Sequence, residues 1–273
     1  MSVLPASVSS LFGSDPSLLA TAYGLNGNAG SGQSPIIALA TAERDQARDI
    51  KRTAAEPEVA RAIKTFTAAV KGATDVRQLL ANPGAMRLLL IANGLGDQAN
   101  FTALARKALM SNPADPKSVV NQLTDLRWKP VVKTYQFATK GLSVIKDPKV
   151  IDTVAGAFAE FSWRQSLEKS TPGLSKALTF RAQAAKFTSA DQILGDAVMR
   201  DVVTTALGIP KQIAFQPLEA QEKAITTRLD IKKLQDPKFV ENFTKRYLMN
   251  VTADAATTPD LTTLATRLRG LVV

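Results

Sequence analysis

The chain has 273 residues, 45% of them apolar, and a formal net charge of +10, which fits a globular protein with a basic surface. It contains neither Cys nor His, which excludes disulfides, thiolate nucleophiles, imidazole catalysis and zinc sites with Cys or His ligands. Carboxylate or lysine chemistry and an all-oxygen metal site are not excluded. No apolar run approaches the length of a transmembrane helix.

The first 35 residues are rich in Ser, Gly and Asn, as in "NGNAGSGQS", and hold few large apolar side chains. This composition predicts that residues 1–35 form a flexible leader. The leader does not resemble a secretory signal peptide, because it lacks a basic n-region and its apolar stretches are interrupted by Ser, Gly and Asp. Two interpretations stay open: plain terminal disorder, or a segment used for export or docking rather than for folding.

From Pro35 onward the sequence pattern is helical. Ser34 is placed as an N-cap, with Pro35 at the first helical position. Apolar residues then recur at the spacing of one helix face, and convincing strict alternation is missing, so the predicted fold class is all-α. Three of these apolar faces are Val59, Ile63, Phe66 and Val70; Phe101, Leu104, Ala105, Ala108 and Leu109; and Phe239, Val240, Phe243, Tyr247 and Leu248.

The nearest thing to a basic stripe lies in the first of these helices. Arg44 and Arg48 are followed by Lys51 and Arg52, but acidic residues at 43, 45 and 49 interleave with them. Mixed signs along a helix predict a solvated face. Arg44 and Arg48 are nevertheless candidate interface residues, because a basic surface attracts acidic partners.

The tripeptide Asp-Pro-Lys occurs three times, beginning at Asp115, Asp147 and Asp236. Asp can cap a helix, and Pro is well suited to the first helical position. The pattern therefore predicts that each Asp starts a helix, with Val119 and Val240 pointing inward after the first and third. A ligand-binding Asp–Lys pair is the alternative.

A shift of 114 positions aligns residues 63–95 with residues 177–209 without a gap. Phe66 then pairs with Phe180, and Gly94 pairs with Gly208. Glycine at these positions predicts a left-handed helix C-cap in both segments. The alignment predicts two tandem copies of a multi-helix module.

The predicted organisation is a leader (1–35), a first module (36–140), a second module (141–250) and a tail (251–273). The tail contains an amphipathic helix whose apolar face would dock on its own domain or on a partner helix. That face consists of Leu261, Leu264, Leu268 and Leu271, of which Leu264 and Leu268 are candidate interface residues.

The two Trp residues, Trp128 and Trp163, are further interface candidates. Tryptophan is prominent in binding hot spots when exposed, and otherwise serves as a packing anchor. Either side chain would become an interface residue to test if it were exposed.

Enzymatic activity would need carboxylate pairs, and the candidates are Asp152 with Glu160 and Glu219 with Glu222. Both pairs are adequately explained as solvated helix faces. The segment "GLGDQ" lacks the strand and Lys of a phosphate-binding loop. We therefore predict no catalytic, cofactor-binding or metal-binding residues, no cofactor and no enzymatic activity.

The repeated segments also carry a family resemblance. The segments "TDVRQLLANPGAMRLLLIANGL", "NPADPKSVVNQL", "TSADQILGDAVMRDVVTTALGIP" and "QDPKFVENFTKRYL" resemble a helical alphaproteobacterial family of unknown function, over about residues 40–250. Members of that family are often encoded among flagellar genes. The resemblance implies a link to the flagellum and no particular reaction, and it supplies no catalytic residues.

These observations predict a non-enzymatic structural or protein-interaction component of the flagellum or its assembly. Its partner would be a protein, either a flagellar component or a second copy of the chain. Its location would be cytoplasmic or, after passage through the flagellar export apparatus, outside the cell. The alternatives are a basic nucleic-acid-binding protein, which is disfavoured because no DNA- or RNA-binding motif is recognisable, and a cytoplasmic scaffold.

Overall fold

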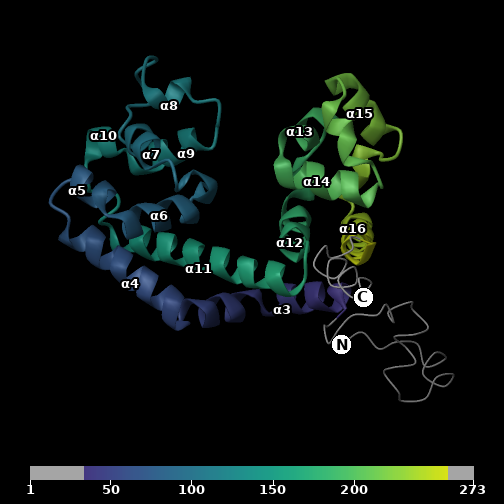
Figure 1. Cartoon of the computed structure of the whole chain (residues 1–273), viewed down its shortest axis with the longest axis horizontal. Coiled ribbons are helices and arrows are strands. Elements are labelled where there is room, and N and C mark those ends of the chain that lie inside the picture. Colours follow the sequence, from purple (N-terminus) through teal and green to yellow (C-terminus); the bar gives the residue numbers. More distant parts are fainter. Residues whose placement is uncertain (1–33, 258–273) are drawn as a thin grey trace, which may run out of the picture. The chain divides into compact units, whose positions relative to one another are not determined.

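A computed structural model describes residues 34–257 of the chain. Within that range all regular secondary structure is helical, and no strand occurs (Figure 1). The predicted all-α fold class is therefore confirmed. Helix α3 (Pro35–Ala54) begins at the predicted proline, where the missing N–H costs no hydrogen bond.

The chain divides into two compact units, Arg44–Leu167 and Met1–Glu43 with Glu168–Val273. We call the first the inserted unit, because its sequence lies between the two parts of the second, the split unit. Both unit boundaries fall inside long helices, α3 and α11 (Pro148–Ser170). The predicted module boundary at residue 140 lies within the inserted unit, so compact units and predicted modules divide the chain differently.

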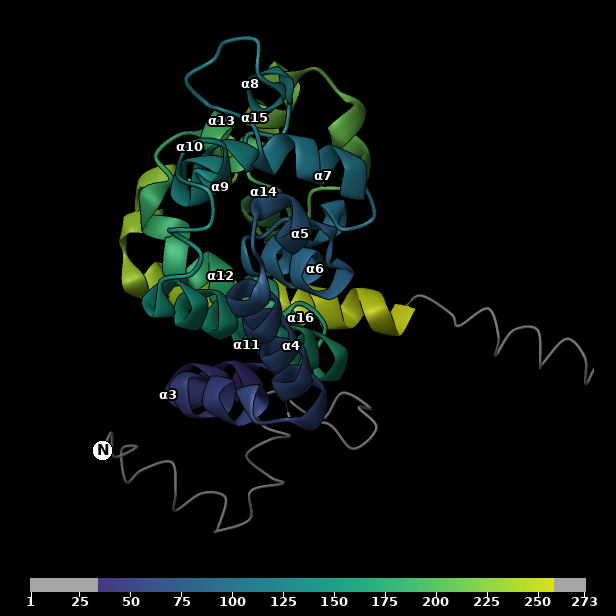
Figure 2. The same cartoon turned by 90° about the vertical axis from the view of Figure 1, so that its left-hand side faces the viewer.

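After α3, the inserted unit is built from short helices and closes with the long helix α11. In chain order these elements are α4 (Pro57–Gly72), α5 (Val76–Ala81), α6 (Pro83–Ala92), η1 (Gly96–Gln98), α7 (Thr102–Leu109), α8 (Val119–Gln122), α9 (Trp128–Tyr135) and α10 (Phe137–Lys140). Helix α6 packs against α4 and α5, and α7 packs against α8 and α9 (Figure 2).

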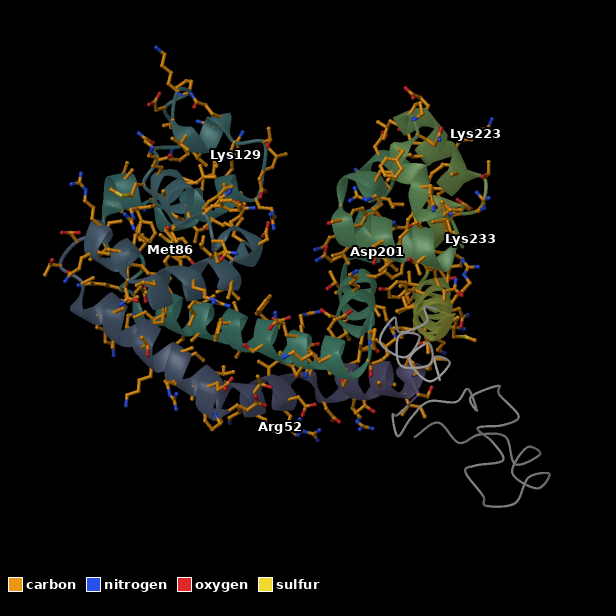
Figure 3. All side chains as sticks on the ribbon, viewed as in Figure 1. Arg52, Met86, Lys129, Asp201, Lys223 and Lys233 are labelled. Atoms are coloured by element: carbon orange, nitrogen blue, oxygen red, sulfur yellow. The ribbon has the colours of Figure 1, made fainter. Side chains whose placement is uncertain are left out.

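One apolar core holds the inserted unit together. It gathers Phe66 from α4, Leu89 from α6, Leu109 from α7 and Ile151 from α11, each almost fully buried. Met86, labelled in Figure 3, belongs to the same core. The predicted inward face of α4 is confirmed, because Val59, Phe66 and Val70 are buried and Ile63 is partly buried.

The split unit resumes at the end of α11. Its further elements are α12 (Leu174–Gln183), η2 (Ala184–Lys186), α13 (Ala190–Gly195), α14 (Ala197–Ala206), η3 (Lys211–Phe215), α15 (Leu218–Thr226), η4 (Ile231–Gln235) and α16 (Pro237–Thr257). Helix α16 packs against α12 and α14. At this contact the rings of Phe180 and Phe243 stack with their centroids 5.5 Å apart, and Tyr247 is buried beside them on α16.

Gly173 is required where α12 begins. Its φ is +85°, and a Cβ there would lie 3.1 Å from the hydroxyl oxygen of Tyr247. The carboxylate of Glu168 accepts hydrogen bonds from the backbone N–H groups of Gly173 (2.8 Å) and Ser175 (3.2 Å). A negative charge at a helix N-terminus is favourable, so Glu168 stabilises the start of α12.

Helices of matching length recur 114 positions apart. Helices α5 and α13 have six residues each and begin at Val76 and Ala190. Helices α6 and α14 have ten residues each and begin at Pro83 and Ala197. Before α5 the backbone N–H and hydroxyl of Thr74 donate to Gln78 Oε1, at 2.7 and 2.9 Å. Thr188 makes the same two bonds to Gln192 before α13, at 2.9 and 3.3 Å.

The ends of α6 and α14 are also alike. Gly94 and Gly208 have φ of +73° and +63°, which confirms the predicted left-handed C-caps. Leu95 N–H donates to the Leu90 carbonyl at 2.8 Å, and Ile209 N–H donates to the Thr204 carbonyl at 2.9 Å. Both helices therefore end in a Schellman motif.

The three Asp-Pro-Lys segments share one local geometry. In each, the Asp side chain accepts a hydrogen bond of 2.9 Å from the backbone N–H of the Lys two residues later. Asp147 and Asp236 precede α11 and α16 directly, as predicted. The prediction is wrong for Asp115, because a turn follows it and α8 begins only at Val119, with Ser118 as its N-cap residue.

The two valines that were predicted to point inward differ. Val240 is buried in α16, but Val119 is only partly buried and Val120 is the fully buried residue of α8. Val119 nevertheless packs against the core of the inserted unit, so both valines at the start of α8 contact that core.

Candidate functional site

Both tryptophans that were predicted as interface candidates are buried. Trp128 is 1% exposed at the start of α9, and Trp163 is 2% exposed on α11. Neither ring offers a surface to a partner, so both act as packing anchors, the alternative that the sequence left open.

The candidates Arg44 and Arg48 are exposed, with 73% and 68% of their side chains accessible. Both guanidinium groups contact Asp45 Oδ2 at 2.9 Å, and Arg48 also contacts Asp49 at 3.2 Å. The hydrogen bond from Arg44 holds the pKa of Asp45 below its usual value. The stripe is therefore accessible but largely neutralised by its own acidic neighbours. The other two interface candidates, Leu264 and Leu268, lie outside the described residues.

The first candidate carboxylate pair is not brought together. Asp152 and Glu160 are eight residues apart on α11, which corresponds to about 12 Å along a helix axis. Glu160 instead contacts Arg164 at 2.8 Å, as an ion pair one helical turn long. The two carboxylates therefore cannot act on one bond.

The second pair gains a partner that the sequence did not indicate. Glu222 on α15 forms a hydrogen bond with Asp191 on α13, and this bond raises the pKa of Glu222, with desolvation and the charges of Asp191 and Glu219 adding to the rise. The Glu222 side chain is partly exposed to solvent. Among the described residues, no group of three or more acidic side chains could hold a metal ion.

A hollow of about 540 Å³ lies beside this carboxylate pair in the split unit. Asp191, Leu194, Arg200 and Leu218 are among the residues that line it. Arg200 donates to the carbonyl oxygen of Leu194 at 2.7 Å, so its guanidinium also serves to satisfy the end of α13.

Two phenylalanines are exposed at matching places. Phe101 lies just before α7 and is 59% exposed, and Phe215 ends η3 and is 88% exposed. They are 114 positions apart, and each stands seven residues after its capping glycine, Gly94 or Gly208. Phe101 was predicted to lie on an inward helix face; that prediction is wrong, because the helix begins one residue later and only Ala105, Ala108 and Leu109 are buried on it.

The loop near Phe101 is held by Arg127. Its guanidinium donates to the carboxylates of Asp97 and Asp125, at distances from 2.7 to 3.1 Å, and to the Gly94 carbonyl at 2.7 Å. These hydrogen bonds lower the pKa of Asp97 to about 2. Leu126, which precedes Arg127 in the chain, is 68% exposed. The loop region that Arg127 holds by hydrogen bonds therefore presents apolar surface.

None of the helices within residues 34–257 combines the length and apolar character needed to cross a lipid bilayer. The described residues thus form two compact all-α units, and exposed phenylalanines stand at positions 101 and 215, which are 114 residues apart.

The family model described as "Protein of unknown function (DUF1217)" matches residues 92–240, just over half of the chain, and the chain belongs to this family.

The chain is also similar to an X-ray crystal structure of a protein from Agrobacterium tumefaciens, solved as a structural-genomics target. The TM-score is 0.62 at 22% sequence identity, and the match covers 82% of this chain and 96% of that chain. The likeness shows a shared fold. No curated protein matches the sequence.

Proposed function

We propose that the chain arose by duplication of a helical module. The matching helix lengths, the repeated Thr–Gln bonds and the two Schellman motifs support this proposal. Beyond Gly94 and Gly208 the two segments differ, since α8 and α9 are short whereas α16 is continuous. A sequence profile built from relatives over residues 57–95 should detect the segment at 171–209. Failure to detect it in any relative would contradict duplication.

We further propose that the protein is a non-enzymatic interaction component of the bacterial flagellum or its assembly. The observation that supports this proposal most directly is that Phe101 and Phe215, which stand 114 positions apart, are both exposed. Large exposed aromatic side chains are costly in water and are enriched in binding hot spots. Their recurrence in both segments suits a partner that is contacted twice, and the family resemblance supports the link to the flagellum.

The experiment compares motility and localisation in flagellated cells that carry the gene. Removing the gene should impair motility, and the variant with Phe101→Asp and Phe215→Asp should reproduce this defect while remaining folded. The matched control is Met249→Asp, because Met249 is also 59% exposed but has no exposed counterpart. Normal motility and unchanged localisation of flagellar proteins without the gene would rule against a flagellar role.

A second candidate function is nucleic-acid binding, favoured by the uneven distribution of charge. Residues 44–167 contain nineteen Lys and Arg against eleven Asp and Glu, so the inserted unit carries +8 of the total +10. Binding to DNA or RNA that weakens steeply as salt rises would support this candidate. Mobility-shift assays over a salt series test it.

A further inference from the structure

A second hollow, of about 470 Å³, opens in the inserted unit between the last turn of α7 and the loop that leads to α8. Three basic residues line it: Arg106, Lys107 and Lys117. All three side chains are exposed, and none makes an ion pair with any residue in the range 34–257. The loop contains the first Asp-Pro-Lys segment, which does not start a helix.

Among the described residues that line this hollow, Asp115 is the only acidic one. One of its carboxylate oxygens accepts the backbone N–H of Lys117 at 2.9 Å. Three cations therefore face one carboxylate that already has a local hydrogen bond. The hollow keeps a net positive charge that its own residues do not neutralise.

The loop is held in shape from within. Ser111 is 7% exposed; its hydroxyl donates to the Lys107 carbonyl at 2.9 Å and accepts the Val120 N–H at 3.3 Å. The Asn121 side chain donates to the carbonyls of Pro113 and Asp115, at 3.0 and 2.9 Å. Because these bonds fix the loop before any ligand arrives, a ligand would not bear the entropic cost of ordering it.

The helix dipole accounts for only part of this cluster. Arg106 and Lys107 lie in the last turn of α7, where positive charge is favourable without a ligand. Lys117 belongs to the loop and has no such reason to be there. The hollow of the split unit is lined by one cation, Arg200, and one carboxylate, Asp191, so of the two hollows described only that of the inserted unit gathers several cations.

We propose that this hollow binds an acidic segment of a protein partner. Carboxylates of that segment would contact Arg106, Lys107 and Lys117 through charge-assisted hydrogen bonds. Met110 and Val119, both partly buried, also line the hollow and provide an apolar contact for a side chain beside the carboxylates. The net charge of the inserted unit supplies the long-range attraction. The inference rests on the proposed interaction function and assigns it a binding chemistry.

The test uses the full chain and a fluorescein-labelled peptide of alternating Glu and Leu, followed by fluorescence anisotropy at about 150 mM salt, where diffuse attraction is screened. Replacing Arg106, Lys107 and Lys117 by Ala should weaken binding roughly tenfold or more, as expected for lost charge-assisted bonds. The matched control replaces three exposed cations of the same unit that make no ion pair with described residues. They are Lys64, Lys71 and Arg77.

The control variant should change the affinity by less than about twofold, because exposed charges farther away are screened. Equal weakening in both variants, or no peptide binding at all, would overturn the proposal. The proposal would also be overturned if single-stranded DNA or inorganic phosphate displaced the labelled peptide at a lower concentration than an unlabelled acidic peptide does. Circular dichroism of each variant checks folding.

Failure of this inference is distinguishable from failure of the proposed function. If the three-cation variant supports normal motility while the Phe101 and Phe215 variant does not, the flagellar role stands and the acidic-segment site is rejected.

Discussion

Replacing Phe66 by Ala should remove a central support of the inserted unit. The side chain is 1% exposed on α4 and belongs to the core shared with α6, α7 and α11. Truncating a buried Phe to Ala costs roughly 3–5 kcal/mol of unfolding free energy, because apolar contacts are lost and a cavity remains. Phe180→Ala is the matched change in the split unit, where the side chain is 0% exposed and stacks on Phe243. The lost aromatic pair adds about 0.5–1.5 kcal/mol to its cost.

The positions of the tryptophans allow the two units to be followed separately. Trp128 and Trp163 both belong to the inserted unit, so intrinsic fluorescence excited at the tryptophan band reports its unfolding. Far-UV circular dichroism reports helices of both units. In urea titrations, Phe66→Ala should shift the fluorescence midpoint strongly. Phe180→Ala should lower the urea midpoint of the dichroism transition. It should lower the midpoint of the fluorescence transition by a smaller amount, unless the two units unfold together.

A cost below about 1 kcal/mol for Phe66→Ala would refute the reasoning, because it would mean that the residue's space is filled or was never tightly packed. A lower cost for Phe180→Ala than for Phe66→Ala would contradict the contribution assigned to the ring stack. Equal slopes of free energy against urea in wild type and variants are the control that the folded and unfolded states are unchanged.

Three other changes have defined outcomes. Gly173→Ala should cost roughly 2–5 kcal/mol in urea unfolding, since it adds a clash to the strain of a left-handed Ala, whereas Gly94→Ala, with open space around it, should cost only about 1–2 kcal/mol. Glu222→Gln should raise the melting temperature at pH 8 but not at pH 4. The folded-state pKa of Glu222 is raised, so stability is lost as pH rises through it, and replacing the carboxylate removes the repulsion from Asp191. Arg127→Ala should cost about 1 kcal/mol or less at pH 7, because its carboxylate partners are partly exposed, and the difference from wild type should vanish as pH falls from about 4 to 2 in acid-unfolding curves. The glycine prediction would be contradicted if Gly94→Ala lowered the free energy of unfolding more than Gly173→Ala. The Glu222 prediction would be contradicted by a higher melting temperature of Glu222→Gln at pH 4. The Arg127 prediction would be contradicted if the cost of Arg127→Ala did not change with pH.

The sequence predicted local features well where one residue type dictates the backbone. Pro35 begins α3, and Gly94 and Gly208 adopt the left-handed conformation that ends their helices. In these cases the steric preference acts within a few residues, so it can be read without knowing the rest of the fold. The inward face of α4 was also predicted, because its period of apolar residues is long and regular.

Features that depend on distant residues were missed. Phe101 continues an apolar period but lies at the N-cap of α7, so tertiary context rather than periodicity decides its exposure. Asp115 has the same local geometry as Asp147 but is followed by a turn instead of a helix. The contact of Glu222 with Asp191, and the convergence of Lys117 on the end of α7, join separate segments and leave no signal at short spacing.

The split unit has a consequence for the order in which the protein folds during synthesis. Leu39 and Ala42 are buried and Glu43 pairs with Arg181 at 2.9 Å, so this part of α3 depends on residues made much later. At roughly 5–20 residues per second, a ribosome needs about 5–18 s to make residues 168–257 after Leu167. The inserted unit can fold during that interval, while the apolar side chains at the start of α3 stay exposed until the rest of the split unit has been made. Nascent chains stalled once Leu167 has left the ribosome, but before residue 181 has, should therefore protect residues 57–154 from protease and leave residues 34–43 open to cleavage.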